Sequence, residues 1–482
     1  MSTFVDRHNE LTFFNNLLTR ARPGPAQLVL LYGRRRVGKT ALLSHWVAQS
    51  DLPYTYWVAD KESAALQRRS FAAAILNTPE ESAPMFDSWP VLWRWLAPRL
   101  AQESARKILI IDELSYAAEA DQAVLSALQH AWDQQLKDSN LVMVLCGSQV
   151  NAMESMMKHQ SPLFGRFTGQ WKLEPLPFAA LREFFVGWQT DERVALYAVI
   201  GGIPAYLEWL DPAVGLVENI RDIMLAPGSM FMAEPQFLLY DELRDPQTYL
   251  SILQAISNGN HTLSAISQAA LVERTGLPRF LQRLQELQLI ERRLPVTLNK
   301  AAQKKSRQGR YHLADPFFRF YFRFLAPHQN AFMPQQETLI HIQNELRAFV
   351  GLGFEQLAQQ WVAAQARAGK LPFVPEAIGA HWGSTAQIDV VAINWHTHDV
   401  LLGECKWGDR PVERAVVDDL VQRKGPALRA ILEENGPQWQ LHYAIFARAG
   451  LTENALSALQ AHSGMMIDLP LMDQILTNTT KA

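Results

Sequence analysis

The stretch Gly33-Arg-Arg-Arg-Val-Gly-Lys-Thr40 matches the pattern G-x-x-x-x-G-K-[ST] at each of its fixed positions. The apolar run at 27–32 precedes it, and an amphipathic stretch follows it. The octet therefore lies between an expected strand and an expected helix, which is the context that this pattern requires. This context predicts a loop that holds the phosphates of a nucleoside triphosphate.

Each fixed residue of the octet has a physical role in such a loop. Gly33 and Gly38 let backbone N–H groups turn toward the phosphates, where a side chain would block them. Lys39 should reach the β- and γ-phosphates, and the Thr40 hydroxyl should bind Mg²⁺. The predicted cofactors are therefore ATP and Mg²⁺.

Two further apolar runs end in polar residues that suit hydrolysis. Residues 107–111 form a buried strand followed by Asp112, which would orient the magnesium, and Glu113, which would polarise the attacking water. Residues 141–146 are followed by Ser148, which would sense the γ-phosphate; a helix N-cap is the alternative. Arg166 follows at loop distance and would act as an arginine finger, or else form a surface salt bridge.

The composition is that of a globular protein in a reducing compartment. The chain has 482 residues, a net charge of −3 and two cysteines. The cysteines fall in different predicted domains, which favours free thiols and the cytoplasm. We find no signal-peptide layout and no apolar run near the roughly 18 residues that a membrane span needs, so no membrane association is expected.

The pattern of strands and helices predicts an α/β protein of three domains. Residues 1–234 alternate strands and helices around a parallel sheet, as in a P-loop NTPase with a helical lid. Residues 235–325 read as three helices and a two-stranded wing, which predicts a winged helix-turn-helix. Residues 326–482 begin a new α/β pattern.

A group of charged residues in the last segment predicts a second metal site. Asp389 lies on an expected strand, and Glu404 and Lys406 lie two residues apart on the next one, so their side chains leave the same face. Glu355, on the preceding helix, is a further candidate. The arrangement is similar to the PD-(D/E)xK nuclease core, in which carboxylates hold Mg²⁺ and a lysine helps to place the nucleophile. A solvated strand face is the alternative.

The segment between residues 271 and 325 is basic. It contains twelve lysine and arginine residues and four acidic residues. Such an excess predicts contact with the DNA backbone, with Arg279 and Arg283 on the third helix and Lys304, Lys305 and Arg307 on the wing. A winged helix that binds protein is the alternative.

Taken in order, the motifs resemble the archaeal-type ATPase family, which belongs with the AAA+ and STAND-like P-loop ATPases. The segments that carry the resemblance are FVDRHNEL at 4–11, the octet, LIIDEL at 109–114, LCGSQ at 145–149, SPLFGRFTG at 161–169 and GGIPAYL at 201–207. The resemblance implies that Asp6, Arg7 and Glu10 lie near the adenine pocket and that GGIPAYL belongs to the lid. YHLADPFFRF at 311–320, IDVVA at 388–392 and GECKW at 403–407 resemble the C-terminal extension of the family.

Together these features predict an ATPase that couples its nucleotide state to DNA binding and to Mg²⁺-dependent cleavage of nucleic acid. The alternative is a STAND-like signalling switch or DNA-binding regulator whose C-terminal domain does not cleave and whose homo-oligomeric state depends on ATP.

Overall fold

The computed structural model describes residues 4–20, 25–102, 105–243, 245–329, 334–433, 436 and 438–479. The chain divides into two compact units. The first comprises Met1–Pro175 and Ile203–Ala205, and the second comprises Leu176–Gly202 and Tyr206–Ala482. The predicted domain boundaries at 234/235 and 325/326 stay predictions.

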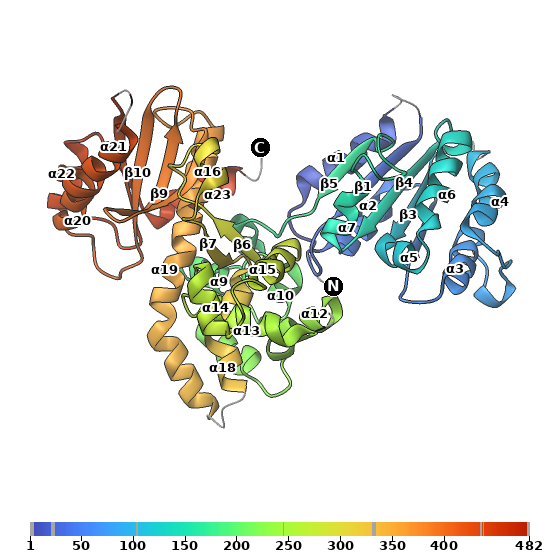
Figure 1. Cartoon of the computed structure of the whole chain (residues 1–482), viewed down its shortest axis with the longest axis horizontal. Coiled ribbons are helices and arrows are strands. Elements are labelled where there is room, and N and C mark those ends of the chain that lie inside the picture. Colours follow the sequence, from blue (N-terminus) through green and yellow to red (C-terminus); the bar gives the residue numbers. More distant parts are fainter. Residues whose placement is uncertain are drawn as a thin grey trace. The chain divides into compact units, whose positions relative to one another are not determined.

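A five-stranded parallel sheet forms the centre of the first unit, in the order β2-β3-β4-β1-β5 (Figure 1). Its strands are β1 (Gln27–Tyr32), β2 (Tyr54–Val58), β3 (Lys107–Asp112), β4 (Leu141–Gly147) and β5 (Gly169–Lys172). Because β4 lies between β3 and β1, the carboxyl ends of these three strands are adjacent. The octet, the acidic pair and Ser148 follow these three ends.

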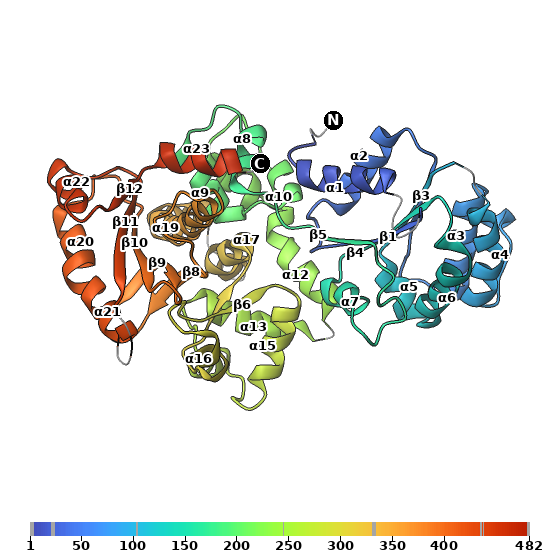
Figure 2. The same ribbon diagram turned by 90° about the horizontal axis from the view of Figure 1, so that it is seen from above.

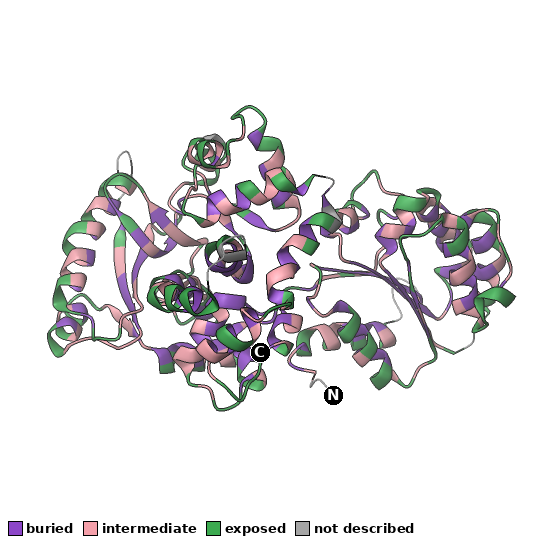
Figure 3. Cartoon of the chain, turned by 90° about the horizontal axis from the view of Figure 1, so that it is seen from below, coloured by how far each residue is buried: buried purple, intermediate pink, exposed green. Residues whose placement is uncertain are grey.

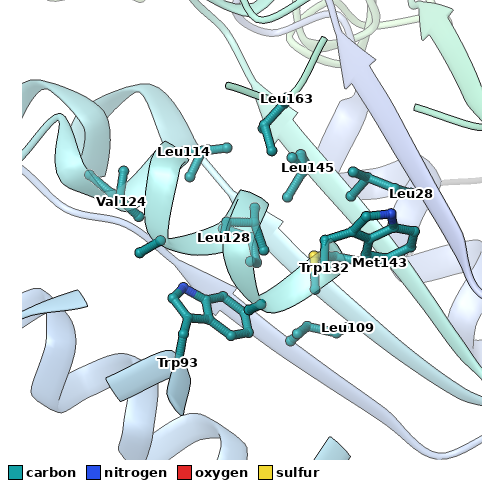
Figure 4. Close-up of a cluster of buried hydrophobic side chains, with 14 of the residues drawn as sticks. Leu28, Trp93, Leu109, Leu114, Val124, Leu128, Trp132, Met143, Leu145 and Leu163 are labelled. Atoms are coloured by element: carbon teal, nitrogen blue, oxygen red, sulfur yellow. The ribbon is translucent and has the colours of Figure 1, made fainter. Parts of the chain in front are cut away.

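Helices cover both faces of this sheet. They are α1 (His8–Thr19), α2 (Lys39–Ser50), α3 (Ala64–Leu76), α4 (Trp89–Ala101), α5 (Leu114–Ala120), α6 (Ala123–Ala131) and α7 (Val150–Ser155). Figure 4 shows the core on one face, where Leu109 and Met143 of the sheet lie near Trp93, Leu128 and Trp132 of the helices. Burying a side chain of this size stabilises a fold by about 1.5–3 kcal/mol.

The second unit begins with helices and a small sheet. The helices are α8 (Leu181–Phe184), α9 (Thr190–Ile200), α10 (Pro204–Glu208, which starts within the first unit), α11 (Leu216–Asn219), α12 (Met230–Glu242), α13 (Pro246–Ser257), α14 (Leu263–Ala270) and α15 (Leu277–Glu286). β6 (Ile290–Arg293) and β7 (Arg310–Leu313) form an antiparallel pair around α16 (Lys300–Lys305). Three helices followed by two strands were predicted here.

A second five-stranded sheet, in the order β12-β11-β10-β9-β8, forms the C-terminal part of this unit. Its strands are β8 (Ala377–Trp382), β9 (Gln387–Asn394), β10 (Asp399–Lys406), β11 (Gln440–Ala447) and β12 (Met465–Ile467). β9 is antiparallel to both of its neighbours, whereas β10, β11 and β12 are parallel. The remaining helices are α17 (Pro316–Phe320), α18 (Ala326–Gln329), α19 (Gln335–Arg367), α20 (Arg414–Asp418), α21 (Gly425–Glu433), α22 (Glu453–Gln460) and α23 (Leu469–Thr479).

This sheet is buried between two layers of helices (Figures 2 and 3). On one face, Phe354 and Leu357 of α19 pack against Val390 and Leu401, and α9 belongs to the same cluster. Helices α20, α21 and α22 cover the other face. Helix α9 therefore belongs to the core of the C-terminal sheet, although it lies about 190 residues earlier in the chain than that sheet.

Cys146 and Cys405 are both free thiols. Within the described ranges, every helix is either too short or too polar to cross a membrane.

Candidate functional site

The nucleotide loop leaves β1 in a conformation that depends on its glycines. A Cβ atom on Gly33 would lie 2.4 Å from the carbonyl oxygen of Leu173, so no other residue fits there without a backbone shift. Gly38 has a φ of 95°, in the left-handed region that favours glycine. Lys39 is buried, and its Nζ donates to the carbonyl oxygens of Gly33, at 2.9 Å, and Arg34, at 3.2 Å. The Lys39 side chain therefore folds back onto the loop that precedes it.

The two predicted magnesium ligands lie side by side. The Thr40 hydroxyl donates to Oδ2 of Asp112 at 3.3 Å, and the other carboxylate oxygen accepts the N–H of Glu113 at 2.9 Å. A hydroxyl and a carboxylate at this separation suit Mg²⁺, which takes one or two protein oxygens and completes its shell with water and phosphate. The donor set therefore fits the predicted metal.

Tyr56, on the neighbouring strand β2, was not among the predicted site residues. Its hydroxyl donates to Oδ2 of Asp112 at 2.6 Å. Burial and the adjacent Asp112 carboxylate raise the pKa of Tyr56, so this hydroxyl stays protonated and acts as a donor. The sequence has no spacing signal for this contact, because it depends on the pairing of β2 with β3.

Glu113 and Ser148, from the ends of β3 and β4, contact each other directly. The N–H and the hydroxyl of Ser148 both donate to Oε2 of Glu113, at 3.1 and 2.9 Å. Glu113 has a φ of 51°, which is uncommon for a residue with a side chain and often marks a functional position. The N-cap of α7 is Gln149, so Ser148 does not take the alternative role of cap.

Arg166 is engaged in an ion pair. Its Nε and one Nη donate to the two carboxylate oxygens of Asp133 at 2.8 and 2.6 Å, and the other Nη donates to the carbonyls of Pro162 and Phe164. This hydrogen bonding lowers the pKa of Asp133. The arrangement matches the salt-bridge alternative, and a role for Arg166 at the γ-phosphate stays a prediction.

The C-terminal candidates come together at one end of β9 and β10. Nζ of Lys406 donates to Oε1 of Glu404 at 2.8 Å. Oδ2 of Asp389 accepts the N–H of Cys405 at 3.0 Å. Sequence reasoning missed Lys424, whose Nζ donates to Oε2 of Glu404 at 2.7 Å from a π-helical segment at Asp419–Lys424. Glu404 is therefore held between two ammonium groups.

Two carboxyl groups of this cluster, those of Glu355 and Asp389, have raised pKa values. Burial, together with the charges of Asp389 and Glu404, raises the pKa of Glu355 to about 8. Burial and the charge of Glu404 raise the pKa of Asp389. Clustered carboxyl groups with raised pKa values are common where a cation or a proton is handled.

The donor set of oxygens suits Mg²⁺, but its geometry is not that of a ready-made metal centre. Among the described residues, no three histidine, cysteine, aspartate or glutamate side chains are grouped closely enough to hold a metal ion. Both Glu404 oxygens are already bonded to lysines. The predicted metal role of Glu355, Asp389 and Glu404 therefore requires side-chain movement and stays a prediction.

The basic segment between β6 and β7 lies against strand β8. The N–H of Val296 donates to the carbonyl of Ala380 at 2.9 Å, and the indole N–H of Trp382 donates to the carbonyl of Gln308 at 3.1 Å. Lys304 and Arg307 are exposed on this segment, and the side chain of Lys305 lies outside the described residues. Arg279 on α15 is exposed, whereas Arg283 is half-buried and pairs with Glu286. The segment therefore carries its charge at the edge of the C-terminal sheet.

Comparisons with known proteins match two stretches of the chain to protein families. A family described as an ATPase domain predominantly from Archaea matches residues 4–210, and a family of archaeal and bacterial proteins of unknown function matches residues 321–417. An uncharacterized protein of Methanocaldococcus jannaschii is 31% identical over 415 residues, covering 84% of this chain and 88% of that protein.

Solved structures with partial similarity include a Walker-type ATPase of Pyrococcus abyssi. That structure is 20% identical, covers 66% of this chain and 96% of its own, and has a TM-score of 0.48. The ORC2 protein of Aeropyrum pernix, solved with ADPNP and ADP, is 14% identical, covers 72% of this chain and 97% of its own, and has a TM-score of 0.43.

Proposed function

Because the chain belongs to the archaeal-type ATPase family, we propose that it hydrolyses ATP with Mg²⁺ and couples its nucleotide state to DNA held by the second unit. The observation that carries the hydrolytic part is the meeting of Thr40, Asp112, Glu113 and Ser148 at adjacent strand ends. Such a site contains both a place for the metal and a base for the attacking water.

The chain's own residues supply the chemistry around the triphosphate. Lys39 moves from the carbonyls of Gly33 and Arg34 to the phosphates, because its ammonium pairs more strongly with an anion than with neutral oxygens. Thr40 and Asp112 would hold Mg²⁺, which would supply charge neutralisation at the triphosphate. Glu113 orients the water, and Ser148 positions the Glu113 carboxylate.

For the second unit we propose that DNA binds along the basic segment and is cleaved at the carboxylate cluster. The exposed Lys304 and Arg307 would contact phosphates, and this segment adjoins β8 of the sheet that carries the cluster. Asp389, Glu404 and Glu355 would hold Mg²⁺, which would activate a water for attack on a phosphodiester. Lys406, which is more exposed than Lys424, would be the lysine that moves toward the scissile phosphate.

Helix α9 is the element through which the two activities would communicate. Its buried Arg193 makes two hydrogen bonds with Asp473 of α23, at 3.0 and 2.7 Å. Its Asp191 accepts a hydrogen bond from the Arg448 guanidinium, and the backbone N–H of Arg448 donates to the carbonyl of Lys406. The chain passes from α9 through Gly201 and Gly202 into Pro204. The Pro204 ring is the nearest neighbour, at 3.6 Å, of a Cβ placed on Gly38.

A cleavage assay tests the proposal. Labelled DNA would be incubated with ATP and Mg²⁺ or Mn²⁺, with the wild-type chain beside Asp389→Ala and Lys39→Ala. We expect Asp389→Ala to lose cleavage and keep ATP hydrolysis, and Lys39→Ala to lose hydrolysis. If the wild type never cleaves DNA or RNA, the nuclease part is wrong.

The two lysine contacts of Glu404 favour a second candidate function. Because Glu404 is bonded to two lysines, the C-terminal part would then bind DNA without cleaving it, and ATP would set an oligomeric state. Gel shift and sizing chromatography, with and without an ATP analogue, separate the two candidates. Binding and ATP-dependent assembly without cleavage would support a signalling switch or regulator.

A further inference from the structure

Arg7 lies beside the nucleotide loop in a backbone conformation that residues with side chains rarely adopt. Asp6 and Arg7 have φ values of 60° and 69°, both in the left-handed region. Two such residues in succession persist only where the surrounding contacts hold them. Arg7 is also buried, with 6% of its surface exposed.

The Arg7 guanidinium makes hydrogen bonds to three separate segments. It donates to Oε1 of Glu10 at 3.0 Å, to the carbonyl of Glu174 at 2.8 Å and to the carbonyl of Val37 at 2.9 Å. Glu174 follows β5, and Val37 lies within the octet. The arginine therefore ties the nucleotide loop to the start of α1 and to the chain beyond β5.

The bond to Val37 constrains one particular peptide group. In a trans peptide the C=O and the N–H point in opposite directions, so holding the Val37 carbonyl fixes the direction of the Gly38 N–H. That N–H points away from Arg7. Arg36 and Gly38, the residues on either side of Val37, both have positive φ, so the chain turns sharply on both sides of this residue.

We propose that Arg7 is a positioning residue that keeps the Gly38 N–H directed at the nucleotide phosphates, and that it does not bind adenine. The inference rests on the proposed binding of ATP at this loop. Without Arg7, the Val37–Gly38 peptide can rotate and present its carbonyl oxygen to the phosphates, which repel it. The resemblance described above instead implies a place for Arg7 near the adenine pocket.

Two ligands distinguish these roles. Calorimetric titration of the full chain with a non-hydrolysable ATP analogue, and with inorganic tripolyphosphate, would compare the wild type with Arg7→Lys. The lysine keeps the charge but cannot reach three acceptors at once. If Arg7 positions the loop, both affinities fall about tenfold, as for the loss of one charged hydrogen bond. An adenine contact would lower the affinity for the ATP analogue alone.

Arg106 offers a matched control. Its guanidinium also holds a main-chain carbonyl, that of Leu17 at 2.7 Å, but at the other end of α1. Arg106→Lys should leave both affinities unchanged. Arg7→Gln, which keeps a donor without the charge, provides a second variant, and circular dichroism would verify the fold of each.

The outcomes separate the two proposals. Failure of the wild type to bind either ligand would contradict nucleotide binding at the loop itself. If the wild type binds and Arg7→Lys binds both ligands with the same affinity as the wild type, the proposed role of Arg7 is wrong. The same holds if Arg7→Lys loses affinity for the ATP analogue but not for tripolyphosphate. If neither Arg7 variant folds, its role is in folding and the proposal also fails.

Discussion

At the scale of single residues, the two acidic sites differ in what holds their carboxylates. Asp112 and Glu113 accept hydrogen bonds from uncharged donors, the hydroxyls of Tyr56 and Ser148 among them. Glu404 is instead held by two ammonium groups. The first site can therefore bind a cation after small side-chain rotations. In the second site, one lysine must first move away from Glu404 before a metal ion can bind there.

Glu113→Gln should retain ATP binding and lower ATP hydrolysis by at least about a hundredfold, because the amide cannot polarise the attacking water. Nucleotide affinity and steady-state phosphate release would be measured together. Ser148→Ala is the comparison: the backbone N–H of Ser148 still holds Glu113, so we expect a smaller loss, below about tenfold. Equal hydrolysis by Glu113→Gln and the wild type would exclude Glu113 as the base.

The pKa of Glu355 gives a stability prediction whose sign can be worked out. The folded-state pKa is about 8, above the ordinary value of 4.5, because of burial and the charges of Asp389 and Glu404, which outweigh the opposite effect of Arg293 and Arg319. The folded chain therefore binds this proton more tightly than the unfolded chain. Its stabilising contribution is complete below pH 4.5 and is lost as the pH rises through 8.

Glu355→Gln should therefore be more stable than the wild type at pH 8.5 and similar to it at pH 4.5. Each pKa unit corresponds to about 1.4 kcal/mol, so the difference is at most a few kcal/mol. Denaturant unfolding in the presence of a chelator would measure it at both pH values. The same difference at both pH values would show that the carboxyl group is not titrating in this range.

At the scale of elements, the sequence predicted those strands and helices that have clear periodicity. β1, β3 and β4 are almost wholly buried, and β9, β10 and β11 each contain a run of buried residues, so their patterns were readable. β5, β8 and β12 were missed because they are short or half-buried, and Ala377–Trp382 has no alternation of apolar and polar residues. Helix α19, which carries Glu355, is 33 residues long and begins at Gln335.

The candidate site was predictable where a local motif carried it, and not where the fold brought distant residues together. The octet, Asp112 and Glu113 follow from spacing along the chain. Tyr56 and Lys424 do not, because their contacts arise from strand pairing and from a π-helical turn packed on the sheet. A lone tyrosine or lysine has no local pattern that marks it.

The basic segment between β6 and β7 gives a prediction about DNA binding. Replacing both Lys304 and Arg307 with glutamine should weaken binding and lower the slope of log affinity against log salt by about 2, roughly 0.9 for each phosphate that the protein no longer neutralises. Fluorescence anisotropy at several salt concentrations would measure this slope. Arg94 and Lys158, exposed in the first unit, are the control pair, and an equal loss from their replacement would mean that the effect is only one of net charge.

At the scale of the whole molecule, the chain order and the packing order differ. The match to an archaeal ATPase domain extends to residue 210, yet α9, at Thr190–Ile200, shares its core with α19 and the C-terminal sheet. A buried ion pair between Arg193 and Asp473, with side chains 4% and 6% exposed, fixes this packing. The second unit therefore cannot complete its core until segments from both ends of its sequence have packed together.

Asp473→Ala should destabilise the second unit by about 3–5 kcal/mol, because it leaves a buried guanidinium without its partner. Denaturant unfolding followed by tryptophan fluorescence would report the loss. Asp222→Ala, which removes an exposed ion pair with Arg221, should leave unfolding unchanged. A similar midpoint for Asp473→Ala and the wild type would mean that the ion pair does not hold α9 in place.

The crossing of α9 and α19 has a consequence for how this chain can diversify. A Cβ atom on Gly353 would lie 2.4 Å from the Cβ of Ala198, so the two helices touch through their smallest side chains. Exchanging α19 and the C-terminal sheet between relatives therefore preserves this contact only when positions 198 and 353 remain a compatible pair of small residues. Recombinants that inherit positions 198 and 353 from different parents should express poorly, whereas those that inherit both positions from one parent should express well.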